Sequence, residues 1–142
     1  MKKILIILSL IITLMLSGCV VTVESNYDTD NDNQNLTYVD AKFYEYFDDK
    51  ECVALFFDYT NNSGESKCPG DGFVMGVRQN GELLGVLAVA EEVDGAIKPY
   101  TSVETGVTIR VAWLFVLRDK STLSVVVSDG QEFTVDYEQI GN

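Results

Sequence analysis

"TIRVAWLFVL", residues 108–117, is the stretch that decides the fold class. Because successive side chains of a β-strand point to opposite faces, its residues fall into two sets. One set is apolar throughout: Ile109, Val111, Trp113, Phe115 and Leu117. The other set starts with the polar Thr108 and Arg110 but is apolar from Ala112 onward. Apolar side chains on both faces are typical of a strand that is covered on both sides, so we predict a central strand of a β-sheet.

Short apolar runs separated by turn residues continue on both sides of this stretch. No segment keeps a helical apolar period over three turns. Further strands are expected at about 38–47, 51–60, 72–78, 82–88, 122–127 and 133–137. "QNG" at Gln79–Gly81 predicts a tight hairpin turn, because Asn-Gly readily supplies two residues with positive φ. Regular short strands with turns between them predict an all-β chain, an antiparallel β-sandwich of about seven strands.

The N-terminus has the features of a bacterial lipoprotein signal peptide. Lys2 and Lys3 precede the apolar run "ILIILSLIITLML" at residues 4–16, which is too short to span a bilayer but suits a signal-peptide core. "LSGC" at Leu16–Cys19 then resembles a lipobox, whose cysteine is lipidated and becomes the mature N-terminus. We therefore expect removal of residues 1–18 and a membrane anchor of acyl chains, such as palmitate, on Cys19 at the extracytoplasmic face. The alternative is an ordinary secreted protein in which Cys19 falls by chance.

A polar segment separates the expected anchor from the first strand. Residues 24–35 contain Tyr27 as their only aromatic and cannot bury enough apolar surface to offset their ordering entropy. Residues 19–36 are thus predicted to be a lipidated N-terminus with a flexible acidic tether, and residues 37–142 the folded domain. A calcium loop starting at Asp28 would need Gly and Glu where Asn33 and Val39 stand, so no metal site is predicted there.

The charge of the chain excludes one class of partner. The sequence has a net charge of −12, and from Cys19 onward 22 acidic and 8 basic residues give −14. Nucleic-acid binding needs Lys and Arg for the phosphates, so no nucleic-acid partner is expected. The same charge argues against binding of anionic lipid by the folded domain, which leaves the lipid on Cys19 as the expected contact with the membrane.

Three segments carry a resemblance to a known family. They are "YTNNS" at Tyr59–Ser63, "QNGELL" at Gln79–Leu84 and "GVTIRVAWLFVLRDKS" at Gly106–Ser121. In this order and spacing they resemble an uncharacterised family of immunoglobulin-like domains on Gram-positive surface lipoproteins. The resemblance, over about Leu36–Tyr137, implies an immunoglobulin-like sandwich with no established activity and no catalytic residues. Arg78 departs from the pattern, because an apolar residue is expected before the glutamine.

These motif residues also have a purely structural interpretation. Asn61, Asn62 and Ser63 form turns readily, and Asp119 to Ser121 end a strand for the same reason. A structural role in turns is therefore favoured over a role in a binding loop.

Most catalytic chemistry is absent from the sequence. The chain has no histidine, which removes the usual general base and the commonest zinc ligand. The adjacent carboxylate pairs Asp48–Asp49 and Glu91–Glu92 lie in predicted polar turns, and no phosphate-binding glycine loop occurs. We expect neither an enzyme nor a protein with a cofactor, and we predict no catalytic, cofactor-binding or metal-binding residues.

Cys52 and Cys68 leave two possibilities open. An exported compartment permits a disulfide, which would close a loop of about 15 residues and could contribute up to about 3 kcal/mol. If the strands at 51–60 and 72–78 formed a hairpin, however, Cys52 would lie far from the turn and Cys68 close to it. The alternative is one half-buried strand cysteine and one loop thiol.

The sequence thus predicts a membrane-anchored lipoprotein whose immunoglobulin-like domain binds a protein partner or supports an envelope assembly, without catalysis. The loops at Asn61–Asp71 and Glu91–Ser102 are the expected contact surfaces, because binding residues concentrate on loops at the ends of sandwiches. The alternative function is a small-ligand or cation-binding surface lipoprotein that uses its acidic surface.

Overall fold

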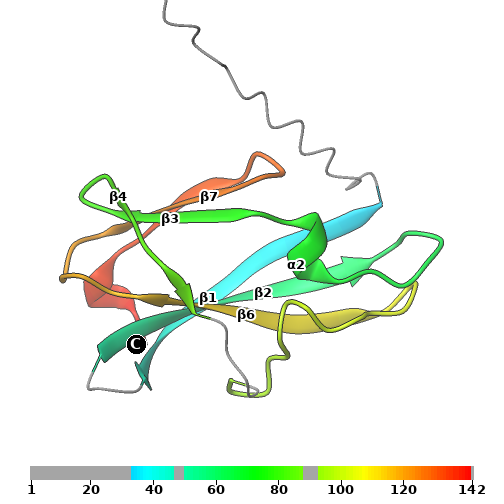
Figure 1. Ribbon diagram of the computed structural model, residues 1–142, viewed down its shortest axis with the longest axis horizontal. Helices are drawn as coiled ribbons and strands as arrows, with labels where there is room; N and C mark the ends of the chain where they lie inside the picture. The colour runs from blue at the N-terminus through cyan, green and yellow to red at the C-terminus, as the bar shows by residue number, and fades with distance from the viewer. Residues whose placement is uncertain (1–32, 47–49, 88–92, 142) are drawn as a thin grey trace, which may run out of the picture.

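The computed structural model describes residues 33–46, 50–87 and 93–141, which form two antiparallel four-stranded sheets (Figure 1). The first sheet has the order β1-β2-β6-β5, with β1 at Gln34–Tyr46, β2 at Lys50–Asn61, β6 at Thr108–Val116 and β5 at Val86–Leu87. The second has the order β4-β3-β7-β8, with β4 at Glu82–Leu83, β3 at Met75–Gln79, β7 at Leu123–Val127 and β8 at Glu132–Val135. The predicted β-sandwich is confirmed, with eight strands in place of about seven.

The main core lies between the two sheets. It combines inward side chains of β2 and β6 with those of β3, β7 and β8: Val53, Leu55, Phe57, Tyr59, Val111, Trp113, Phe115, Val77, Leu123, Val125, Val127 and Val135. Phe57 lies at its centre, edge-on to Trp113 with ring centroids 5.5 Å apart. The apolar face predicted for residues 108–117 is therefore the face that closes the sandwich.

A second, smaller core covers the other face of β6. Ala112 and Leu114 pack there with Ala54 and Phe56 of β2 and with Val93 and Ala96, which follow β5 in the chain. Val93 and Ala96 bridge each other across a tight turn in which Asp94 and Gly95 have φ values of 47° and 77°. This turn explains why β6 is apolar on both faces, as the sequence indicated.

The predicted strand at 82–88 is two strands in different sheets. β4 pairs with β3 and β5 pairs with β6, so the chain crosses from one sheet to the other between them (Figure 1). Leu84 still donates its N–H to Val77 at 2.8 Å, whereas the carbonyl of Gly85 already accepts from Val116 of the other sheet. The prediction of one strand was wrong because apolar alternation indicates the face of a strand but not its sheet.

Several predicted boundaries also shift. β1 begins at Gln34 and Leu36 is only 2% exposed, so the last three residues assigned to the tether belong to the sheet. The third strand starts at Met75 because Pro69–Gly72 form a short helical turn, α2. β8 ends at Val135 and a 3-10 turn, η1 (Tyr137–Gln139), follows it. β2 and β3 lie in different sheets and do not form a hairpin.

The turn at Gln79–Gly81 is confirmed. Asn80 and Gly81 have φ values of 48° and 83°, and Gln79 pairs with Glu82 across the turn. Positive φ at both central residues is the geometry for which Asn-Gly is suited.

Candidate interaction surface

The two loops expected to contact partners lie against each other. Lys67 and Val103 exchange both backbone hydrogen bonds, at 3.1 and 2.9 Å. Gly70 of α2 donates its N–H to the carbonyl of Pro99 at 2.7 Å. Residues 61–71 and 98–103, far apart in sequence, thus form one continuous surface at this end of the sandwich, which we call the paired-loop surface.

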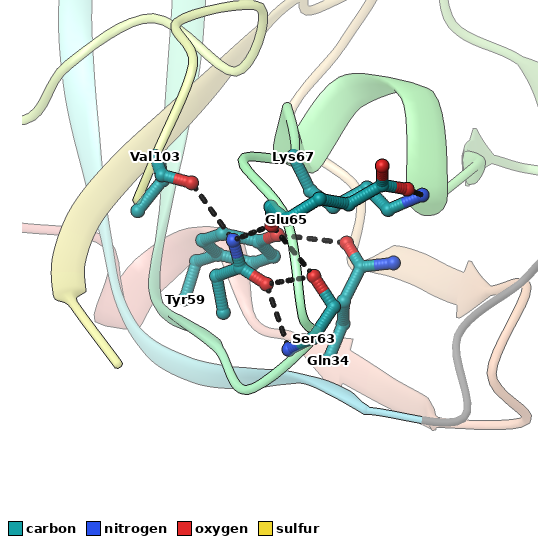
Figure 2. Close-up of polar contacts among 7 residues, drawn as sticks. Gln34, Tyr59, Ser63, Glu65, Lys67 and Val103 are labelled. Carbon is teal, nitrogen blue, oxygen red and sulfur yellow. Dashed lines mark hydrogen bonds and ion pairs between the residues drawn. The ribbon is translucent and has the colours of Figure 1, made fainter. Parts of the chain in front are cut away.

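Asn61 connects the two loops from the inside of the paired-loop surface, and Figure 2 labels its partners Glu65, Val103 and Ser63. Its side chain is completely buried, and its Nδ2 donates to the carbonyls of Glu65 at 2.9 Å and Val103 at 2.8 Å. Its Oδ1 accepts from both the backbone N–H and the hydroxyl of Ser63. Every hydrogen-bonding site of the amide is used, so this buried polar group carries no desolvation penalty for unmade bonds.

Tyr59 and an ion pair lie beside this amide (Figure 2). The Tyr59 hydroxyl donates to Oε1 of Gln34 at 2.7 Å, which ties β1 to β2. Burial, assisted by the nearby Cys68, raises the pKa of Tyr59 to about 12, so the hydroxyl keeps its proton at physiological pH. Lys67 contacts Glu65 at 2.7 Å and, through this hydrogen bond, lowers the pKa of the exposed Glu65 carboxyl.

A second buried amide, that of Gln79, connects the other two segments that carry the family resemblance. Gln79 is 1% exposed; its Nε2 donates to the carbonyls of Asp119 and Ser121, and its Oε1 accepts from the N–H of Arg118. Asn80 donates to Asp119 as well, at 2.8 Å. Hydrogen bonds from Ser121 and then Asn80 lower the pKa of Asp119, so the turn is fixed around a carboxylate.

The three segments that carry the family resemblance therefore have structural roles. The "NNS" segment places Asn61 inside the paired loops, while the "QN" and "RDKS" segments bind each other through Gln79 and Asp119. The structural interpretation of these turns accounts for all of these contacts. The surface available for binding is the exterior of the loops that the buried amides position.

Cys52 and Cys68 are both free thiols, which is the second of the two possibilities that the sequence left open. Cys52 is buried at the Lys50 end of β2, whereas Cys68 is half-buried and close to Tyr59, near the other end of this strand. Seven residues of β-strand separate Cys52 from Tyr59, about 23 Å, and a disulfide needs Cα atoms within about 7 Å. Burial raises the pKa of both thiols, so neither is an activated nucleophile.

The remaining candidate residues are not among those that the structure describes. They are Cys19, the signal-like segment, Asp28, Asp48–Asp49 and Glu91–Glu92. Within the described ranges, no group of three or more Cys, Asp or Glu side chains is placed to hold a metal ion. Of the helices in the same ranges, none combines the length and the apolarity that crossing a membrane requires.

The sequence and the fold both match known proteins. A family described as a domain of unknown function, DUF5067, matches residues 21–129. The chain belongs to the DUF5067 family. The family match ends in the turn between β7 and β8, so β8 and η1 complete this DUF5067 fold beyond the matched residues.

One solved structure resembles the chain in fold. It is described as "a putative lipoprotein from Staphylococcus aureus subsp. aureus NCTC 8325" and is 10% identical, with a TM-score of 0.63 over 77% of this chain and 87% of that one. At this identity the likeness shows the fold alone. No curated protein matches the sequence.

Proposed function

We propose that this DUF5067 protein is a lipid-anchored surface lipoprotein whose immunoglobulin-like domain binds a protein partner of a Gram-positive envelope, without catalysis. The paired-loop surface is the observation that carries the proposal. Binding sites commonly lie on loops that a rigid scaffold holds in place, and the buried Asn61 amide provides such a support.

The N-terminal sequence supports the anchor. Lys2 and Lys3, the apolar run at 4–16 and the "LSGC" segment stand in the order required for export and lipidation at Cys19. The fold resemblance to a structure described as a lipoprotein agrees with this interpretation. Several acyl chains, at about 0.8 kcal/mol per buried methylene, would hold the chain durably at the extracytoplasmic face of the membrane.

We expect Cys19→Ser to move the protein from the membrane fraction to the soluble or secreted fraction. Serine keeps the size of the side chain but cannot form the thioether to which the lipid is attached. The measurement is membrane fractionation with metabolic labelling by a palmitate analogue, with Cys68→Ser as a matched control that should stay labelled and membrane-bound. Wild-type levels of label on the Cys19→Ser protein would contradict lipidation at this residue.

The partner proposal is tested with substitutions that introduce positive charge on the paired-loop surface. Ser66 and Ser102 are exposed, one on each loop. In living cells, we expect the anchored double variant Ser66→Arg, Ser102→Arg to form at least about 90% less cross-linked product than the anchored wild type. Two large cations introduced into a packed contact should cost several kcal/mol, well above the 1.4 kcal/mol that one factor of ten represents.

The control places the same change on the far sheet. Ser124→Arg with Thr134→Arg alters exposed positions of β7 and β8 and should leave the cross-linked product unchanged. If the control variant loses the product and the paired-loop variant keeps it, the contact surface lies on β7 and β8 and not on the paired loops. If both keep it, the paired loops are not the contact surface.

A further inference from the structure

A pocket of about 560 Å³ opens at the side of the sandwich where the chain crosses between the sheets. Its apolar lining includes Val86 and Leu87 of β5, Pro99, and Trp113 of β6. Lys98 and Tyr100 form its polar rim. The volume lies within the range of about 300–1,000 Å³ that is typical of small-molecule sites, which are mostly apolar with a few placed polar groups.

The turn that carries Tyr100 is held rigidly before any ligand binds. Thr101 donates its N–H to the carbonyl of Lys98 at 3.1 Å, closing the turn. The two carbonyls at its tip also accept bonds, that of Pro99 from Gly70 and that of Tyr100 from the Cys68 thiol at 3.5 Å. A ligand contacting this turn would therefore pay little ordering entropy.

The ring of Tyr100 has one covered and one open side. It packs directly on the backbone of Gly70, where a β-carbon would lie only 2.5 Å from the ring. Tyr100 is nevertheless 68% exposed, the largest value among the exposed large apolar and aromatic side chains of the described chain. A fixed aromatic ring with a free face beside an apolar pocket provides a contact surface at low entropic cost.

The charge at the rim differs from that of the molecule. The chain has 22 acidic and 10 basic residues, yet among the residues that the structure describes no carboxylate lines the pocket and one lysine does. Among the described residues the ion pairs are Lys42–Asp94, Lys67–Glu65, Arg110–Asp58 and Arg118–Glu82. Lys98 is in none of these pairs, so its ammonium group can meet an anion that enters the pocket.

We propose that this pocket binds a small ligand with an apolar body and a carboxylate group. Val86, Leu87 and Trp113 take up the apolar body, the open face of Tyr100 packs against it, and Nζ of Lys98 pairs with the carboxylate. The pocket shares the turn Lys98–Thr101 with the paired-loop surface, but Ser66 and Ser102, whose substitution tests partner binding, do not line it. Each proposal can therefore fail without the other.

Trp113 provides a direct readout, because it is the only tryptophan of the chain and lies in the pocket wall. The experiment titrates the mature chain carrying Cys19→Ser, which keeps every described residue, with 4-phenylbutyrate, 4-phenylbutan-1-ol and 4-phenylbutylamine. These probes share one apolar body and differ only in charge. We expect saturable changes in Trp113 emission, with the carboxylate binding about two- to fivefold more tightly than the alcohol and the amine most weakly, as an exposed ion pair allows.

Two variants assign the effect to its residues. Lys98→Met keeps most of the aliphatic stem and should make the carboxylate and the alcohol bind equally, whereas Lys120→Met, at a lysine that lies over Tyr137, should preserve the wild-type order. Tyr100→Ser should weaken all three probes severalfold. The proposal is overturned if no probe gives a saturable change up to about 20 mM, a limit that corresponds to only about 2 kcal/mol of binding. It is also overturned if the amine binds as tightly as the carboxylate, or if the preference survives in Lys98→Met.

Discussion

Replacing Asn61 by alanine will lower the free energy of unfolding by about 2–4 kcal/mol, a large change for a substitution that removes no apolar side chain. The variant removes the side-chain donor that reaches the carbonyl of Val103, a residue that is 3% exposed, at 2.8 Å and leaves this carbonyl only the N–H of Lys67. It also removes the donor to Glu65 and the acceptor that holds Ser63. The amide of Asn61 makes four hydrogen bonds, and the loss of each costs roughly 0.5–1 kcal/mol, since both carbonyls keep a second donor.

Urea denaturation followed by the emission of Trp113 measures this change. Because the linear slope reports the surface exposed on unfolding, an unchanged slope with a lower midpoint identifies a loss of stability. Asn62→Ala is the matched control, since Asn62 is exposed and adjacent, and its variant should stay within about 0.5 kcal/mol of wild type. Equal effects at the two positions would show that the buried amide has no special role.

Gln79 is a second buried amide that bonds to several backbone groups, at the other end of the sandwich. It connects the turn after β3 to the segment between β6 and β7 through three hydrogen bonds, again with no charged atom inside the protein. Each amide lies at the end of a strand, where that strand contacts a loop from a distant part of the chain. A neutral side chain with two donors and an acceptor can satisfy several backbone groups there at a lower desolvation cost than a charged one.

Much of the fold could be predicted from local pattern. The alternation in residues 108–117 identified both apolar faces of β6, and the Asn-Gly pair at 80–81 located the β3–β4 turn. These features depend on the alternation of side chains along a strand and on turn-forming residues, both of which are visible in neighbouring positions of the sequence.

Features set by distant contacts could not be predicted in this way. The crossing at Leu84–Gly85 depends on which sheet each strand finds, and the short helical turn α2 replaced the expected beginning of β3. β1 starts earlier than its composition suggests because Leu36 reaches the main core.

The candidate surface was predicted only in outline. Both loops were recognised as exposed polar segments, but their pairing through Lys67 and Val103 joins residues 36 positions apart and leaves no local signal. The burial of Asn61 was likewise not visible, since an Asn-Asn-Ser segment is equally typical of an exposed turn. The pocket needed three separate segments to meet, with Lys98–Thr101, β5 and β6 each supplying part of its lining.

The central claim is that residues 61–71 and 98–103 form one rigid surface rather than two independent loops. It is tested most directly by amide hydrogen exchange of the wild-type domain, read by NMR at Lys67 and Val103, whose N–H groups bond to each other's carbonyls. Loops that open independently would lose these bonds at almost no cost, whereas a cooperative unit opens only with a large part of the fold. We expect both amides to exchange at least about a thousandfold more slowly than in an unstructured peptide, equivalent to about 4 kcal/mol, and at similar rates. Exchange of either amide within about tenfold of the peptide rate would contradict the account, because loops that separate so readily cannot present one preformed surface.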